Sequence, residues 1–92
     1  MSLIAIPPEN LAAVGLIRAV VVDDPDSGLL IMSQRGGCKP GPAGDRVTAF
    51  MTALAATAAR ALLSAHGYNL ERALRMLDTW AAEYADDAAA AS

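Results

Sequence analysis

The first half of the chain contains two short, mainly apolar segments, residues 14–22 and 29–34, and the second of them ends in Ser33 and Gln34. Both are rich in valine, isoleucine or leucine, and the β-branched residues among these favour strands. The segment between them, Asp23–Gly28, holds aspartates, a proline, a serine and a glycine, which are typical turn residues. The pattern therefore predicts a β-hairpin over residues 14–35.

The predicted hairpin is apolar on both faces apart from Arg18, so both faces need a cover. A two-stranded sheet is also marginally stable and has two open edges. Within the N-terminal segment, residues 1–13, Leu3–Ile6 could supply a third strand, and Glu9–Ala13 could form one helical turn or lead directly into the hairpin. The other solution is a second copy of the chain. We therefore expect a homodimer, with the hairpin or the following alanine-rich helix at the interface.

The second half has helical periodicity. Apolar residues recur at helical spacing over Asp45–Ala65 and again over Leu70–Tyr84. Asp45 fits the N-cap of the first helix, and Asn69 fits the N-cap of the second. Gly67 suits the left-handed position that follows a helix end. These signals predict two amphipathic helices joined by a tight break.

The predicted fold class is α+β, with a β-hairpin followed by two amphipathic helices in ββαα order. The 92 residues form one small domain. Residues 36–44 are a Gly/Pro loop, residues 45–85 a helical hairpin, and residues 86–92 a frayed tail. The predicted core consists of Ile17, Val21, Ile31, Phe50, Leu54, Leu62, Leu74, Leu77 and Trp80.

Composition restricts the class of protein. Hydrophobic residues make up 54% of the chain and charged residues 18%, which is too apolar for a disordered protein. The net charge of −3 argues against a nucleic-acid binder. A single cysteine excludes an internal disulfide and a multi-cysteine zinc site, so a reducing cytoplasm is the expected location. The N-terminal residues lack the basic start of a signal peptide, and Arg60 interrupts the alanine-rich helix, so we expect no membrane span.

Candidate reactive groups do not form a recognisable catalytic set. Cys38 lies beside Lys39, which can lower a thiol pKa, but a cysteine nucleophile also needs a base. His66 is the one histidine, and nothing in the sequence brings it to Cys38. The glycine-rich loop lacks the Gly-Lys-Ser/Thr ending of a phosphate-binding loop. A calcium loop starting at Asp24 would need a glutamate where Arg35 stands. The sequence thus predicts no enzyme activity, no cofactor and no metal.

Charge is unevenly distributed. Residues 27–77 carry six basic and two acidic residues, whereas the predicted turn and the C-terminal end are acidic. One interpretation is a site for an anionic partner in this basic middle segment. The other is an ordinary solvated surface with helix pairs such as Glu71–Arg75.

Residues 59–77 resemble the last two helices of ubiquitin-associated domains, although the Met-Gly-Phe-type loop of that family is absent. The same segment resembles a helix-turn-helix with Gly67 in the turn. Its second helix lacks the lysine, asparagine and glutamine side chains that commonly contact base edges. We interpret the segment as a general helical hairpin.

These observations predict a small non-enzymatic regulator, adaptor or inhibitor that binds another protein, in the manner of small phage-type inhibitors. The alternative is a nucleic-acid-binding regulator that uses the second helix and the basic middle segment. Binding surfaces rely on a few large or charged anchors. The candidate partner-binding residues are Arg35, Lys39, Arg72, Arg75, Thr79 and Glu83.

Overall fold

The computed structural model describes residues 7–91 of the chain. Four helices account for 83% of these residues, and no strand occurs among them. α1 spans Pro7–Val21, α2 Pro25–Gln34, α3 Pro42–Ala65 and α4 Leu70–Ala91. The predicted α+β class is therefore wrong, because the described part of the chain is all-α.

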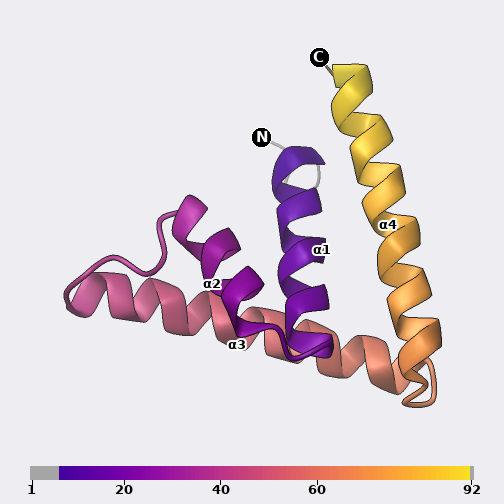
Figure 1. Cartoon of the computed structure of the whole chain (residues 1–92), viewed down its shortest axis with the longest axis horizontal. Helices are drawn as coiled ribbons and strands as arrows, with labels where there is room; N and C mark the ends of the chain where they lie inside the picture. The colour runs from indigo at the N-terminus through magenta and orange to yellow at the C-terminus, as the bar shows by residue number, and fades with distance from the viewer. Residues whose placement is uncertain (1–6, 92) are drawn as a thin grey trace.

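The longest helix, α3, forms a base from which the other three rise on one side (Figure 1). α1 stands between α2 and α4 and packs against each of the other helices. α3 and α4 diverge from their connection and share little contact. The two helices predicted within residues 45–85 are present, but they do not pack as a closed hairpin.

α1 replaces most of the predicted first strand. Val14, Leu16 and Ala19 are buried and Ile17 and Val21 are half-buried, so apolar residues point in several directions around this helix. A helix contacted from several sides is apolar all round and lacks a one-sided periodicity. Its sequence then resembles a strand that is buried on both faces. Tertiary contacts have overridden the β preference of the valines.

The beginning of α1 also differs from the prediction. Glu9 lies in the first helical turn, where its negative charge suits the helix N-terminus. Glu9–Ala13 is thus continuous helix rather than a lead into a strand. The proposed third strand, Leu3–Ile6, lies outside the described residues. The open sheet edges that motivated a homodimer do not exist among residues 7–91.

α2 replaces the predicted return strand. Asp24 is its N-cap: one carboxylate oxygen accepts the Ser27 backbone N–H at 3.3 Å, and the other accepts the Ser27 hydroxyl at 2.6 Å. The hydroxyl bond and then the backbone bond hold the pKa of Asp24 below its ordinary value of 3.8. Pro25 follows at the first helical position, where its missing N–H costs nothing. The same residue types favour turns, which is why the pattern predicts a hairpin here.

α3 begins three residues earlier than predicted. Its N-cap is Gly41, at φ 97°, and Pro42 is the first helical residue, so Asp45 lies in the first turn rather than at the cap. The loop predicted over residues 36–44 is correspondingly shorter. Gly44 is required by packing, because a Cβ there would lie 2.0 Å from the carbonyl oxygen of Lys39.

The connection from α3 to α4 confirms the predicted break. α3 ends at Ala65, and Gly67 adopts a left-handed φ of 63°. The Tyr68 N–H donates to the Leu63 carbonyl at 2.7 Å, as in a Schellman-type helix end. The Asn69 side chain accepts the Arg72 N–H at 3.1 Å, so Asn69 caps α4 as predicted. Residues 86–91 of the predicted frayed tail are the last part of α4, and Ser92 lies outside the described residues.

The core consists of two clusters on either side of α1. One joins Val14 to Leu62 of α3 and to Ala73 and Leu77 of α4. The other joins residues from α1, α2 and α3, namely Leu16, Met32 and Ala55. Each cluster contains one alanine beside larger apolar side chains.

The predicted core is partly correct. Leu62 and Leu77 are buried. Five others are half-buried and pack against the clusters, namely Ile17, Val21, Ile31, Leu74 and Trp80. The prediction is wrong for Phe50 and Leu54 of α3, because they are 65% and 55% exposed. The predicted helix is present, but these two side chains stay largely in contact with solvent, whereas Leu62 farther along the same helix is buried.

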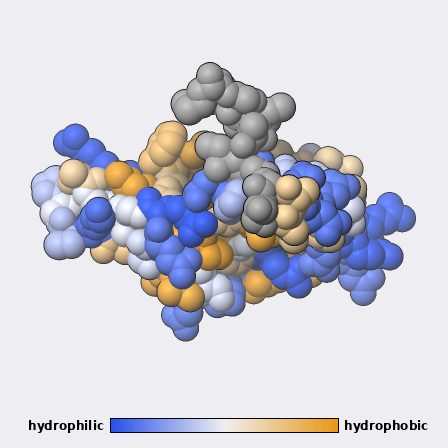
Figure 2. All heavy atoms as spheres, turned by 90° about the horizontal axis from the view of Figure 1, so that it is seen from above, coloured by the Kyte–Doolittle hydropathy of each residue, from blue (hydrophilic) through white to orange (hydrophobic). Residues whose placement is uncertain are grey.

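Most of the apolar surface of α3 is accessible. By length and composition alone α3 could cross a membrane: an 18-residue window has a mean hydropathy of 1.4, despite Arg60, yet only 17% of that window is buried. The prediction that no segment is long and apolar enough to span a membrane is therefore wrong for α3. Core helices of soluble proteins pass the same test when they are mostly buried, and α3 is not. Seen from above, the molecule also has hydrophobic residues among hydrophilic ones at its surface (Figure 2).

Candidate functional site

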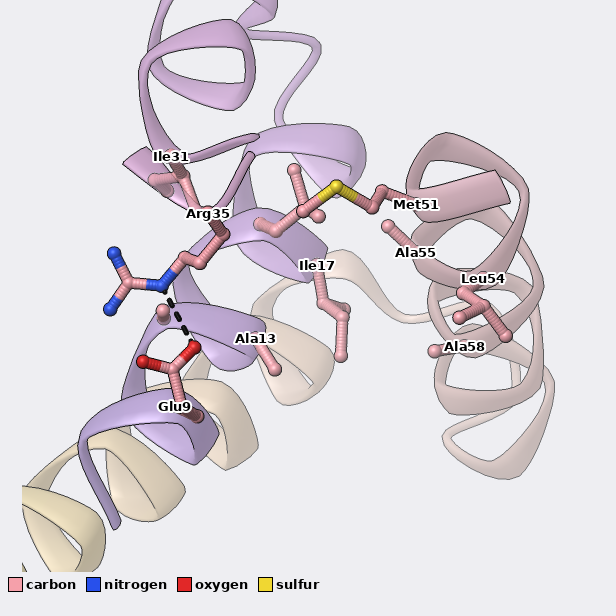
Figure 3. A pocket seen from close by; sticks show the side chains of 11 residues that line it. Glu9, Ala13, Ile17, Ile31, Arg35, Met51, Leu54, Ala55 and Ala58 are labelled. Carbon is pink, nitrogen blue, oxygen red and sulfur yellow. Dashed lines mark hydrogen bonds and ion pairs between the residues drawn. The ribbon is translucent and has the colours of Figure 1, made fainter. Parts of the chain in front are cut away.

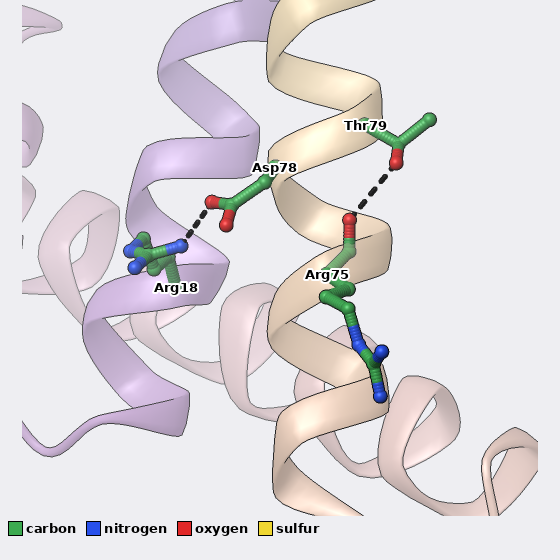
Figure 4. A network of polar contacts seen from close by, with 4 residues as sticks. All are labelled: Arg18, Arg75, Asp78 and Thr79. Atoms are coloured by element: carbon green, nitrogen blue, oxygen red, sulfur yellow. Dashed lines mark hydrogen bonds and ion pairs between the residues drawn. The ribbon is translucent and has the colours of Figure 1, made fainter.

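The sequence-predicted binding residues fall into two separate groups. Arg72, Arg75, Thr79 and Glu83 recur every three or four residues along α4, and all four are exposed. Figure 4 shows Arg75 and Thr79 on the side of α4 away from α1, where the Thr79 hydroxyl donates to the Arg75 carbonyl at 2.9 Å. These residues therefore share one solvated face, on which no helix of residues 7–91 packs.

A different residue, Asp78, lies on the side of α4 that faces α1. Asp78 points toward α1 and forms an ion pair with Arg18 (Figure 4). Both side chains are substantially exposed, so the ion pair should add little to the free energy of unfolding. It links α1 to α4. Neither residue is available as an unpaired anchor for a partner.

The other predicted residues, Arg35 and Lys39, lie at the end of α2 and in the loop that follows it. Arg35 is the C-cap residue of α2, and its Nε donates to a carboxylate oxygen of Glu9 at 3.1 Å. Lys39 is exposed. Because α2 and α4 lie on opposite sides of α1, the structure does not bring the two predicted groups together (Figure 1).

Arg35 borders a groove of about 500 Å³ between α1, α2 and α3 (Figure 3). That volume lies within the range of small-molecule pockets. The groove is lined by Glu9, Ala12, Ala13, Leu16, Ile17, Ile31, Arg35, Met51, Leu54, Ala55 and Ala58.

The groove is apolar except at one end. In Figure 3, Ala13 and Ile17 of α1 face Ala55, Leu54 and Ala58 of α3. The alanines leave room between the helices because they project little beyond the backbone. An incoming helix or large side chain could therefore reach the groove floor closely.

The polar end of the groove carries the Glu9–Arg35 ion pair (Figure 3). The Arg35 side chain is 30% exposed, so its guanidinium is partly covered while its other donors still reach solvent. One end of an otherwise apolar groove is thus marked by charge.

A second cavity of about 400 Å³ lies between α1, α3 and α4, beside Trp80, Met76 and His66. Ile17 and Ala58 line this cavity as well as the groove. The two spaces therefore adjoin where α1 crosses α3.

The remaining chemistry-bearing residues are far apart. Cys38 precedes α3 and His66 follows it, and a helix of 24 residues is roughly 36 Å long. The Cys38 backbone N–H donates to the Thr48 hydroxyl at 2.6 Å, which ties the loop to α3. Cys38 and His66 therefore cannot act together as a nucleophile and its base. Within the described residues, His, Cys, Asp and Glu side chains form no group of three that could hold a metal ion.

Sequence reasoning missed the groove, although it named Arg35 at its rim. The lining alanines carry no chemical signal, and the groove exists only because α1 and α2 are helices. A usable signal was the pairing of Asp24 with Pro25, which marks a helix start. Accepting that start would have placed Ile31 and Arg35 on a helix beside α1.

Comparison with known proteins gives no relative. No protein-family model, no curated protein and no solved structure matches this chain. Function is therefore inferred from the groove, the exposed faces and their charges.

Proposed function

We propose that this protein is a non-enzymatic regulator, adaptor or inhibitor that binds another protein. Its binding site is the groove between α1, α2 and α3, and its ligand is an apolar stretch of helix from the partner. The observation that carries the proposal is the groove itself: about 500 Å³ lined by apolar side chains, with a single ion pair at one end.

The shape of the groove supports a helical ligand. Its α3 wall runs from Met51 to Ala58, which is about two helical turns. A partner helix that presents large side chains at i and i+3 or i+4 would match this length. Leu54, 55% exposed, would lose its contact with water on binding, and such burial contributes about 25 cal/mol per Å² of apolar area.

The charged end gives the groove a direction. Arg35 donates to Glu9 through Nε at 3.1 Å, and its other N–H groups can donate to a second carboxylate. An acidic residue at one end of the partner helix would be favoured there. A basic residue at that position would face Arg35 and be disfavoured, which would set the orientation of the bound helix.

The test is affinity capture from the native host with matched variants. Ala13→Arg places a long charged side chain on the groove wall, and because Ala13 is exposed the fold should be retained. Ala85→Arg makes the same change on an exposed position of α4. Thermal melts establish that both variants are folded.

The proposal predicts a protein that is captured by the wild type and by Ala85→Arg but lost with Ala13→Arg. Equal capture by all three proteins would contradict it. A third variant reverses the charges of Arg72 and Arg75 on the outer face of α4. Loss of capture in that variant alone would place the site on α4, as the sequence analysis predicts, and remove it from the groove.

A further inference from the structure

The groove and the second cavity share one wall, which α3 provides. The α3 residues that line one or both spaces follow helical spacing and so lie on one side of that helix, and they are Met51, Leu54, Ala55, Ala58, Ala61, Leu62 and Ala65. Ala58 lines both spaces. From Met51 to Ala65 the wall is about 21 Å long, or about four helical turns. The two spaces are therefore successive parts of one surface.

Ile17 of α1 also lines both spaces, so it lies where they meet. α1 stands between α2 and α4 (Figure 1), and the groove lies on its α2 side whereas the second cavity lies on its α4 side. Ile17 and Ala58 are both half-buried, so part of each side chain is open to a ligand. A ligand that lies along α3 in the groove therefore contacts these two residues and then reaches the second cavity.

The second cavity differs from the groove in the large side chains that α4 contributes. Three alanines of α3 leave the space open, whereas Met76 and Trp80 of α4 border it. Both α4 residues are half-buried, so each still presents surface to a ligand. An indole ring and a thioether make favourable contacts with a second aromatic ring. The cavity, with a volume of about 400 Å³, thus favours an aromatic group as its occupant.

We propose that the partner helix bound in the groove continues along α3 and places an aromatic side chain in the second cavity, against Trp80 and Met76. This inference rests on the proposed binding of a partner helix in the groove, and it adds the length of that helix and the type of its anchor. The unbroken α3 wall supports one helix of about four turns rather than two separate ligands. Aromatic anchors in pockets commonly supply much of the binding energy of an interface.

Photo-cross-linking from two positions on the α3 wall tests the continuity. A benzophenone amino acid is incorporated in the native host at Leu54, in the groove, or at Ala65, in the second cavity, and both positions are exposed. Ala53, which is exposed and lines neither space, is the control. Leu54 and Ala65 should cross-link to one partner protein at sites about eleven residues apart, because two helices lying side by side rise equally per residue. The site reached from Ala65 should lie within about one helical turn of an aromatic residue.

Filling the second cavity tests the aromatic anchor. Ala65→Trp adds a large side chain at an exposed position of the cavity lining, and Ala53→Trp makes the same change away from both spaces. Thermal melts establish that both variants are folded. Capture of the cross-linked protein should weaken by about tenfold or more with Ala65→Trp and stay at the wild-type level with Ala53→Trp, since the anchor loses its pocket only in the first variant.

Failure of this inference and failure of the groove proposal give different results. Cross-links from Leu54 alone, or to different proteins from the two positions, would leave the groove site in place and refute the continuation into the second cavity. The continuation would also be refuted by sites that are not about three turns apart, by a small molecule or another copy of this chain attached at Ala65, or by wild-type capture with Ala65→Trp. Cross-links from neither position, or from Ala65 alone, would contradict both proposals.

Discussion

Leu77→Ala gives the sharpest test of the packing, because Leu77 has no exposed surface. The substitution removes three carbon atoms, and each buried methylene contributes about 0.8 kcal/mol, so lost transfer accounts for about 2.4 kcal/mol. Val14 of α1 and Leu62 of α3 pack in the same cluster, so a cavity should remain after the substitution and add to the loss of stability. We expect a total destabilisation of about 3 kcal/mol, within the usual range of roughly 2–5 kcal/mol.

Urea denaturation followed by circular dichroism measures this change, with wild type and variant at the same protein concentration. Leu70→Ala is the matched control, because Leu70 begins the same helix and is 49% exposed. The control should lose less than about 1 kcal/mol. A loss below about 0.5 kcal/mol in Leu77→Ala would show that α4 does not pack on α1 as described.

Three further predictions follow from α2 and its flanking residues. Gly28→Ala should stabilise the protein by about 0.5–1 kcal/mol in thermal melts, because a Cβ there meets its nearest neighbours at an ordinary 3.7 Å; a turn glycine in a hairpin would give destabilisation instead. The lowered pKa of Asp24 means that its cap stabilises α2 fully above pH 3.8 and is lost as pH falls through the folded-state pKa, so the stability gap between wild type and Asp24→Ala should close in acid. Cys38→Ser should leave folding and partner capture unchanged, and a lost activity in that variant would overturn the non-enzymatic proposal.

The second half of the fold was predictable from sequence because its signals are local. Gly67 and Asn69 define a helix end and a helix start by backbone conformation and capping, which require no knowledge of the rest of the chain. The direction of the α3 stripe was not predictable in the same way. Phe50 and Leu54 lie at helical spacing, but which stripe of a helix faces the core depends on where its neighbours pack.

The first half was not predictable from its periodicity, because α1 is apolar on several sides. Arg35 could be named as a binding residue from its type and position, whereas its partner Glu9 and the groove beside it required the path of α1 and α2. Alanines such as Ala13 and Ala58 form the walls of the groove by leaving space. The groove depends on how α1, α2 and α3 are positioned relative to one another, which the sequence pattern does not give.

A photoreactive benzophenone amino acid incorporated at Ala13, on the groove wall, would report directly what occupies the groove in the native host. The same group at Ala85, on an exposed position of α4, is the control. The groove position should cross-link to an apolar helical segment of one other protein, identified by mass spectrometry, and the control should not. Identical products from both positions, or cross-links from Ala13 only to another copy of this chain, would contradict the proposed binding of a partner protein in the groove.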